Sequence, residues 1–263
     1  MILSELISFL NRIDAKPKKH LSQNFLIDPN TIQKILELAE VQPGDAVLEI
    51  GPGPGALTHA LLNAGARVYA VEIDTRFATE LHQIQHDRLS VFEADFLTFP
   101  MKRLPPHIKV VANLPYHITA PILEKLFESS FTSLTIMVQK EVAARMAASS
   151  STPDFGSLSL FVQFYSRLSS SFTVPASCFY PRPKVDSTVI RLDARPLPPV
   201  DPAAFFALVH KAFQQRRKML TSTLPFPKDA IRNALTALGI RPDARPEALS
   251  LDQWIAFAKN FIE

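Results

Sequence analysis

The stretch VLEIGPGPGALT, residues 47–58, places three of the chain's seven glycines within five positions, at Gly51, Gly53 and Gly55. The apolar run before the glycines predicts a short buried strand, and the pattern after them predicts a helix. Glycines at such a junction permit a sharp turn and let a ligand approach the main chain closely. Ala56 is an allowed third residue of a dinucleotide fingerprint, and no Gly-Lys-Ser/Thr follows, so the loop predicts a nucleotide-like cofactor without distinguishing NAD from others.

Strands and helices alternate outward from this loop. Further strands are predicted at residues 67–73, 89–94, 108–113, 134–139 and 187–192, and helices at residues 1–10, 57–64, 76–86, 120–128 and 141–148. Another helix is predicted to begin after Asp28, an N-cap residue followed by Pro29. Alternation at this spacing is typical of βαβ units, so we predict an α/β fold: a parallel sheet with helices on both faces.

Prolines mark a predicted domain boundary. Residues 194–202 carry four prolines in nine positions, which is typical of a stiff linker. We therefore predict an α/β domain at residues 1–194 and a helical domain at residues 195–263. Residues 202–263 hold nine Lys or Arg against five Asp or Glu, although the net charge of the whole chain is only +3. This imbalance suggests a surface for a polyanion, with an ordinary solvated helix face as the alternative.

Composition excludes several classes of protein. With 47% hydrophobic and 20% charged residues, the chain can bury a sizeable core, which excludes a disordered protein. Its single cysteine, Cys178, cannot pair within the chain and is compatible with a reducing cytoplasm, where we expect the protein to lie. No apolar run approaches the roughly 18 residues of a membrane span, so no membrane partner is expected. The seven histidines show no ligand spacing, and no metal site is predicted.

Acidic residues end two of the predicted strands. Glu72 stands 21 residues after Gly51, where a carboxylate can accept both hydroxyl hydrogens of a ribose. Asp95 ends the next strand and could accept from the exocyclic amine of an adenine, with a helix N-cap as its alternative role. Ligands of open α/β sheets bind at the carboxyl ends of the strands, so we expect both side chains near the glycine loop.

The sequence Asn-Leu-Pro-Tyr, residues 113–116, ends a further strand. The side-chain oxygen of Asn113 and the carbonyl of Leu114 can accept the two hydrogens of an aromatic amine, and Pro115, which follows them, fixes the chain and adds no competing donor. Tyr116 can stack on the ring, a contact worth about 1–3 kcal/mol per base. Two acceptors would hold an adenine N6 in a more tetrahedral geometry and free its lone pair to attack a methyl sulfonium. The alternative is a plain turn with a core tyrosine.

Nine motifs, spread nearly from end to end, resemble one known family. They are KKHLSQNFL at residues 18–26, VLEIGPGPGALT, AVEID, EADF, NLPYHI, QKEVAARM at 139–146, CFYPRPKVDS at 178–187, FQQRRKML at 213–220 and RPEALS at 245–250. Together they resemble the KsgA/RsmA family of small-subunit ribosomal RNA adenine N6,N6-dimethyltransferases, whose methyl donor is S-adenosylmethionine. The resemblance implies a Rossmann-like class I methyltransferase domain and a small all-helical C-terminal domain that contacts rRNA.

The resemblance also assigns roles to particular residues. It implies cofactor contacts from Asn24, Leu26, Gly51, Glu72, Asp95 and Asn113. Phe179, like its family counterpart, would form with Tyr116 the second wall around an extruded adenine, with a core phenylalanine as the alternative. The chain departs from the family at Ser22, where glycine is usual. If that position needs a positive φ, the serine strains the loop and weakens the assignment of the N-terminal contacts.

The function implied is methylation of two adjacent adenosines near the 3′ end of small-subunit (16S) rRNA during ribosome biogenesis. The partner implied is that rRNA, within an assembling 30S subunit, and a monomer is expected. Arg216, Arg217 and Lys218 would contact phosphates. Three alternatives stay open: a related large-subunit rRNA methyltransferase, which usually has isoleucine at the position of Leu114, a non-catalytic RNA-binding assembly factor, and an NAD-dependent dehydrogenase, for which no hydride-transfer site is evident.

Overall fold

The computed structural model describes residues 1–18 and 21–262, which form two compact units. The first consists of Met1–Ala143 and Leu168–Ala194, and the second of Ala144–Arg167 and Arg195–Glu263. The chain passes between the units after Ala194, inside the proline-rich segment where the sequence predicts a boundary. The predicted domain assignment differs from the structure at residues 144–167, which were expected in the α/β domain but lie in the second unit. Helix α7 (Ser157–Tyr165) explains the difference, since it packs on helices of the second unit's own core.

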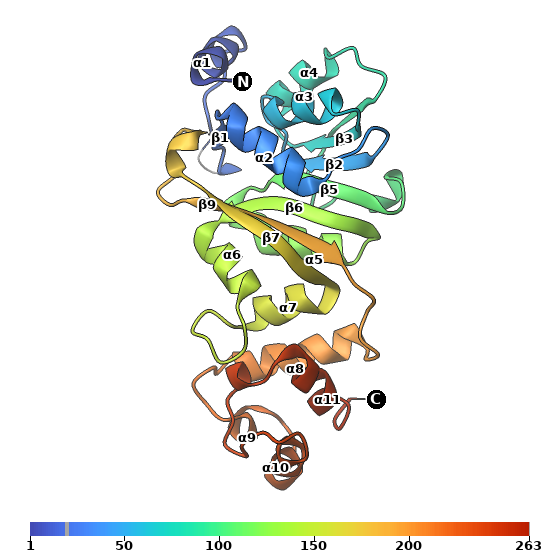
Figure 1. The fold of residues 1–263 in the computed structure, drawn as a ribbon, viewed down its shortest axis with the longest axis vertical. Coiled ribbons are helices and arrows are strands. Elements are labelled where there is room, and N and C mark those ends of the chain that lie inside the picture. The colour runs from blue at the N-terminus through green and yellow to red at the C-terminus, as the bar shows by residue number, and fades with distance from the viewer. Residues whose placement is uncertain (19–20, 263) are drawn as a thin grey trace. The chain divides into compact units, whose positions relative to one another are not determined.

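A seven-stranded sheet organises the first unit, in the order β4-β3-β2-β5-β6-β9-β7 (Figure 1). Its bounds are β2 (Ala46–Ile50), β3 (Arg67–Glu72), β4 (Leu89–Glu93), β5 (Ile108–Asn113), β6 (Phe131–Gln139), β7 (Ser166–Val174) and β9 (Ser187–Ala194). The pairs from β4 to β6 are parallel, and β9 runs antiparallel to β6. The α/β fold is therefore confirmed, with an antiparallel addition at one edge.

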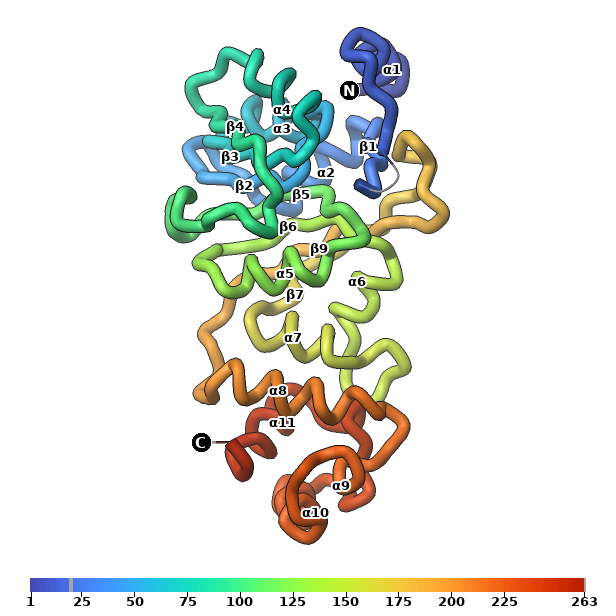
Figure 2. The backbone as a smooth tube through the Cα atoms, turned by 180° about the vertical axis from the view of Figure 1, so that it is seen from behind, coloured from blue at the N-terminus to red at the C-terminus, as the bar shows by residue number. Residues whose placement is uncertain are grey.

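Helices cover both faces of this sheet, as the sequence predicts. Helix α2 (Pro29–Ala39) crosses the front of the sheet in Figure 1, and α5 (Thr119–Phe127) comes to the front in the reverse view of Figure 2. Asp28 caps α2 by accepting a hydrogen bond from the Thr31 N–H at 3.0 Å. Strands β2 and β5 in the middle of the sheet are almost fully buried at residues 47–50 and 110–112, because helices cover both faces.

The other helices of the first unit begin and end close to their predicted positions. They are α1 (Leu3–Arg12), α3 (Ala56–Asn63), α4 (Thr75–His82) and α6 (Lys140–Ala147), the last of which continues into the second unit. The sequence did not predict β7, α7, or the two-residue antiparallel pair of β1 (Phe25–Leu26) with β8 (Phe179–Tyr180). This pair brings together residues about 150 positions apart, which local sequence patterns do not reveal.

The second unit is built from α7 with α8 (Pro202–Phe213), α9 (Leu220–Thr223), α10 (Lys228–Ala237) and α11 (Leu251–Ala258). Its core is aromatic: Phe164, Phe205 and Trp254 are fully buried within one cluster. Asp201 caps α8, and Pro202 occupies the first helical position. Across the described residues, no helix is long and apolar enough to cross a membrane.

Candidate active site

A cleft opens at the carboxyl ends of β2, β3 and β5. Because β2 lies between β3 and β5 in the sheet, this is the point at which the strand order reverses, where ligands bind in open α/β sheets. The cleft is lined by most of the residues that the sequence singles out. They are Asn24, Leu26, Gly51, Glu72, Asn113, Leu114 and Tyr116.

The glycine loop joins β2 to α3 at one wall of the cleft. Gly51, Gly53 and Gly55 have φ angles of +66°, +54° and +85°, a region that side-chain-bearing residues adopt only with strain. Gly53 is also sterically confined, since an added Cβ would lie 3.1 Å from the Phe25 ring. Gly51, by contrast, is exposed and an added Cβ there would meet nothing within 4 Å, so its main chain is available for close approach by a ligand.

Glu72 lies at the end of β3 and is only 4% exposed. One carboxylate oxygen accepts from the Gly53 N–H and the other from the Asp74 N–H, each at 2.8 Å. Burial raises the pKa of Glu72, and these two hydrogen bonds act in the opposite direction. A carboxylate has about four acceptor positions, so it keeps acceptor capacity for ribose hydroxyls in the cleft.

A second buried carboxylate in the cleft, Glu49 of β2, was not found by sequence reasoning. Its side chain is 2% exposed and accepts a hydrogen bond from the Thr58 hydroxyl at 2.6 Å. Burial raises the pKa of Glu49 to about 8, and the nearby Glu72 carboxylate adds to the increase. The signal in the sequence is one glutamate within an otherwise apolar strand.

The protonated state of Glu49 predicts a pH dependence of stability in the cofactor-free protein. Between its ordinary pKa of 4.5 and about 8, the folded state keeps a proton that the unfolded state releases. The free energy of unfolding should therefore fall as the pH rises, by up to about 1.4 kcal/mol per pH unit from this group. Glu49→Gln should flatten the dependence. Urea unfolding at several pH values measures it, with the exposed Glu37→Gln as control, and an unchanged slope in Glu49→Gln contradicts the assignment.

Asn113 ends β5, lines the cleft, and has a side-chain amide that is hydrogen-bonded at only one end. Its Nδ2 donates to the Asn24 main-chain oxygen at 3.1 Å, whereas its Oδ1 is buried and has no hydrogen-bond partner among the described residues. Leaving a buried acceptor unpaired costs about 1–3 kcal/mol. A bound amine that donated to this oxygen would recover the cost. Leu114, the next residue, lines the same cleft.

Tyr116 follows in a short 3₁₀ turn, Tyr116–Ile118. Its hydroxyl is hydrogen-bonded to the Ser187 hydroxyl at 2.7 Å, and burial raises its pKa against the opposing effect of that bond. Because the hydroxyl is fixed, the ring is held at the wall of the cleft, where it can stack on a base.

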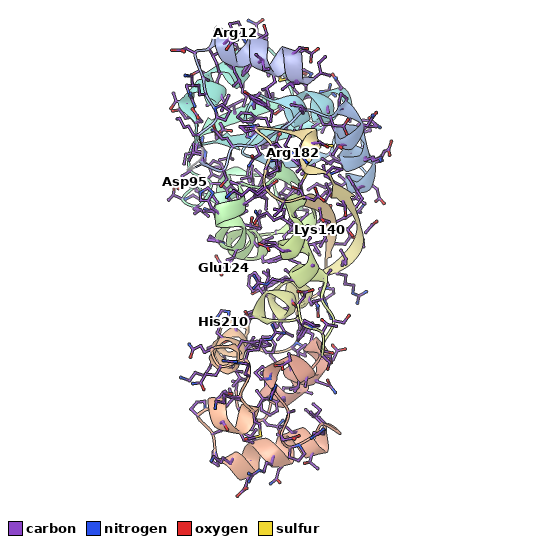
Figure 3. The ribbon with its side chains drawn as sticks, turned by 90° about the vertical axis from the view of Figure 1, so that its left-hand side faces the viewer. Arg12, Asp95, Glu124, Lys140, Arg182 and His210 are labelled. Atoms are coloured by element: carbon purple, nitrogen blue, oxygen red, sulfur yellow. The ribbon has the colours of Figure 1, made fainter. Side chains whose placement is uncertain are left out.

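Two predicted site residues do not line the cleft. Phe179 is 3% exposed and packs in the core cluster with Leu26, its partner across the β1–β8 pair, so its position matches the alternative of a core phenylalanine. Asp95, labelled in Figure 3, accepts a hydrogen bond from the Leu97 N–H at 2.8 Å and so caps a turn. The roles of these two residues toward adenine stay predictions.

Ser22, in the loop before β1, has the positive φ at which a serine is strained. The angle is +51°, in the left-handed region that costs a residue other than glycine roughly 1–2 kcal/mol. The Ser22 hydroxyl lies 2.9 Å from His117 Nδ1, and the Asn24 side chain donates to the Ser22 main-chain oxygen at 3.1 Å. Despite the serine, Asn24 and Leu26 reach the cleft. Lys19 and His20 of the predicted motif lie outside the described residues.

Several lining residues come from places that the sequence did not indicate. Ile73, 51% exposed, follows Glu72 and offers an apolar surface beside it. Leu6 of α1 and Met1, which precedes that helix, also line the cleft. The helix was predicted but its location was not, because it depends on distant packing of Leu6 against a cluster that contains Phe77. Within residues 1–18 and 21–262, no group of acidic, histidine or cysteine side chains is placed to hold a metal ion.

This fold and this cleft define a class I methyltransferase that uses S-adenosylmethionine. The site fits that cofactor, because Glu72 offers acceptors to a ribose, the glycine loop offers bare main chain, and Asn113 offers an unpaired acceptor to a methylatable amine. The model of the family described as ribosomal RNA adenine dimethylase matches residues 14–263, and the chain belongs to this family.

Relatives in this family cover nearly the whole chain. A protein named ribosomal RNA small subunit methyltransferase A from Protochlamydia amoebophila (strain UWE25) is 48% identical, over 96% of this chain and 94% of the relative. One of the same name from Chlamydia felis (strain Fe/C-56) is 42% identical, over 95% and 92%.

Two solved structures are also similar. A dimethyladenosine transferase from Plasmodium falciparum is 25% identical with a TM-score of 0.78, over 90% of this chain and 98% of that one. The 23S rRNA methyltransferase ErmE is 30% identical with a TM-score of 0.71, over 90% and 99%.

Proposed function

We propose that the protein transfers methyl groups from S-adenosylmethionine to the N6 amines of two adjacent adenosines near the 3′ end of small-subunit rRNA. The unpaired Oδ1 of Asn113 carries this proposal, because a buried acceptor at the cleft calls for a donor such as an adenine amine. The names of the curated relatives, at 48% and 42% identity, favour the small subunit. The similarity to ErmE, at 30% identity, makes the large subunit the alternative.

The chain's own groups would act by positioning and polarisation. Asn113 Oδ1 and the Leu114 carbonyl accept the two hydrogens of N6, and Tyr116 stacks on the ring. The cofactor supplies an electrophilic methyl group on its sulfonium. The nitrogen would form the new carbon–nitrogen bond as the carbon–sulfur bond breaks and S-adenosylhomocysteine leaves, and the part of these residues is to hold the amine in line with that bond. No strong general base is needed, since the alkylated nitrogen is acidic and loses its proton to water.

Labelled S-adenosylmethionine tests the proposal directly. The protein is incubated separately with unmethylated small subunits, naked small-subunit rRNA and large subunits, and the label is mapped. We expect label on two adjacent adenosines near the 3′ end of the small-subunit rRNA. Label only in the large subunit would support the ErmE-like alternative. No label in any RNA would support a non-catalytic assembly factor.

We further propose the setting in which the reaction occurs. The substrate is an assembling 30S subunit, met by a cytoplasmic monomer, and the basic part of the chain after residue 202 contacts rRNA phosphates through its FQQRRKML and RPEALS motifs. In this assignment the first unit, which holds the cleft, is the methyltransferase domain, and residues 195–263 supply the rRNA contact. A larger yield of label in small subunits than in naked rRNA would support the assembly setting.

Three neighbouring cations in the second unit give a prediction about RNA binding. Arg217 and Lys218 are exposed, whereas Arg216 donates to the main-chain oxygens of Thr152 and Pro153. Alanine at all three cationic positions should weaken rRNA binding and reduce its salt dependence, by up to about 0.9 in log–log slope per lost phosphate contact on the duplex-DNA scale. Binding measured across a salt series checks this expectation.

A matched control removes charge elsewhere on the same unit. Lys228→Ala with Arg232→Ala takes two cations from α10 and should leave the salt slope nearly unchanged. The double variant Arg217→Ala with Lys218→Ala should carry most of the effect, because Arg216 is already engaged by main-chain carbonyls. These side chains lie in the turn that follows α8 and not on a helix face, and if the triple variant keeps the wild-type slope, they form only a solvated surface.

A further inference from the structure

One buried carboxylate beside the cleft has no part in the mechanism above. Asp74 is 3% exposed and does not line the cleft, although it follows Glu72 by two positions. It accepts from Gln23 Nε2 at 3.0 Å and from Arg76 Nε and Nη2 at 2.9 and 2.7 Å, and Lys18 Nζ lies 3.2 Å away. Burial acts to raise the pKa of Asp74, but the bonds from Arg76, Gln23 and Lys18 outweigh it and the pKa is lowered. The side chain is thus an ionised anchor.

This anchor holds the loop that forms one wall of the cleft. Gln23 donates to Asp74 through Nε2 and accepts from the Lys18 N–H through Oε1 at 2.8 Å. Both ends of its amide are therefore fixed. Residues 21–24 all line the cleft, so the hydrogen bond to Asp74 fixes the position of this wall.

The same loop determines how the Asn113 amide is oriented. The Asn24 main-chain oxygen accepts from Asn113 Nδ2, which leaves Oδ1 as the end of the amide that has no hydrogen-bond partner among the described residues. If this carbonyl moved, the amide could turn over and present its NH₂ where an acceptor is needed. The acceptor therefore depends on the placement of Asn24, one residue after Gln23.

We propose that Asp74 is a positioning residue for methyl transfer, which fixes residues 21–24 and through the Asn24 carbonyl keeps Asn113 Oδ1 turned toward the adenine amine. The inference rests on the proposed function, since it assigns Oδ1 the same role. Asp74 also caps α4, accepting from the Arg76 N–H at 3.3 Å. The test must therefore separate positioning from capping.

Asp74→Ser makes this separation, because serine still caps a helix but is too short to reach Gln23 and carries no charge for Lys18. We expect kcat at saturating cofactor and RNA to fall about tenfold, less than the roughly 10²-fold that a 1 Å misplacement can cost. Asp74→Asn keeps an acceptor for Gln23 and should recover most of the rate. Asp201→Ser, the same change at the cap of α8, should keep the wild-type kcat.

Combination with Asn113→Ala distinguishes positioning from a general structural role. Once the amide is absent there is nothing to orient, so Asp74→Ser should slow the Asn113→Ala enzyme no further. If Asp74→Ser does not fold, Gln23→Ala carries the same test, with a similar loss of kcat and the same lack of additivity. A wild-type kcat in the folded single variants, or a full additional loss in the Asn113→Ala background, would overturn the proposal.

Nuclear magnetic resonance gives a readout that needs no cofactor or RNA. The side-chain amide signals of Asn113 should shift in Asp74→Ser and Gln23→Ala, as its bond to the Asn24 carbonyl loosens, and should stay in place in Asp201→Ser. Unmoved signals would overturn the inference. If the wild-type protein methylates no rRNA, the proposed function fails, and these spectra still decide whether Asp74 orients the amide.

Discussion

Glu72→Ala is expected to weaken the binding of S-adenosylmethionine about 100-fold and to leave the affinity for rRNA within twofold of wild type. The Glu72 carboxylate is the acceptor in the cleft best placed for a ribose, at the end of β3 and directly opposite the glycine loop it holds through the Gly53 N–H. Hydrogen bonds to a charged group are worth about 1.5–3 kcal/mol each. Losing two of them, even at the lower bound, amounts to a factor of about 100 in the dissociation constant.

Calorimetry on the cofactor and filter binding of rRNA measure the two affinities separately. Glu93→Ala is a matched control, because Glu93 pairs with Glu72 across β3 and β4 but is exposed and does not line the cleft. It should bind the cofactor as wild type does. Glu72→Ala also leaves two main-chain N–H groups without their acceptor, so its unfolding temperature is compared first. A folded variant with wild-type cofactor affinity contradicts the ribose assignment.

The parts of the site that could be predicted from sequence are those fixed by strand ends. Gly51, Glu72 and Asn113 each follow a recognisable apolar run, and the carboxyl ends of parallel strands meet at one edge of a sheet. Local pattern together with this topological rule therefore brings together residues up to 62 positions apart. Local sequence alone also predicts that Asp28 caps α2, because the cap depends only on a contact to Thr31, three residues further on.

Features that depend on distant packing could not be predicted in this way. Phe179 was assigned from its motif, but its burial follows from the pairing of β8 with β1, which no local pattern indicates. Residues 144–167 precede the proline-rich segment yet fold into the second unit, because the apolar face of α7 packs with α8 and α11. Asp74 looks like an ordinary N-cap in sequence, and only the folded loop brings Gln23 to it.

Asn113→Ala is expected to lower the rate of methyl transfer by about 10²–10³-fold, by analogy with the loss of one preorganised polar group in another active site. The substitution removes the buried Oδ1, one of the two acceptors for the amine hydrogens. With one acceptor missing, the amine nitrogen should relax toward its planar form, in which the lone pair is delocalised into the ring. Tyr116 and the basic surface of the second unit still hold the RNA, so affinity should change little.

Single-turnover methylation at saturating cofactor and RNA isolates this chemical step from binding. Asn63→Ala, an exposed asparagine at the end of α3, should react at the wild-type rate and controls for the change of residue. Because Asn113→Ala removes the hydrogen bond from Nδ2 to the Asn24 carbonyl as well as the unpaired acceptor, the unfolding temperature of the variant is compared with that of wild type first. If Asn113→Ala is as stable as wild type but methylates slowly, Asn113 acts as a catalytic acceptor. If the variant methylates at the wild-type rate, Asn113 is only a turn residue and the mechanism built on it is excluded.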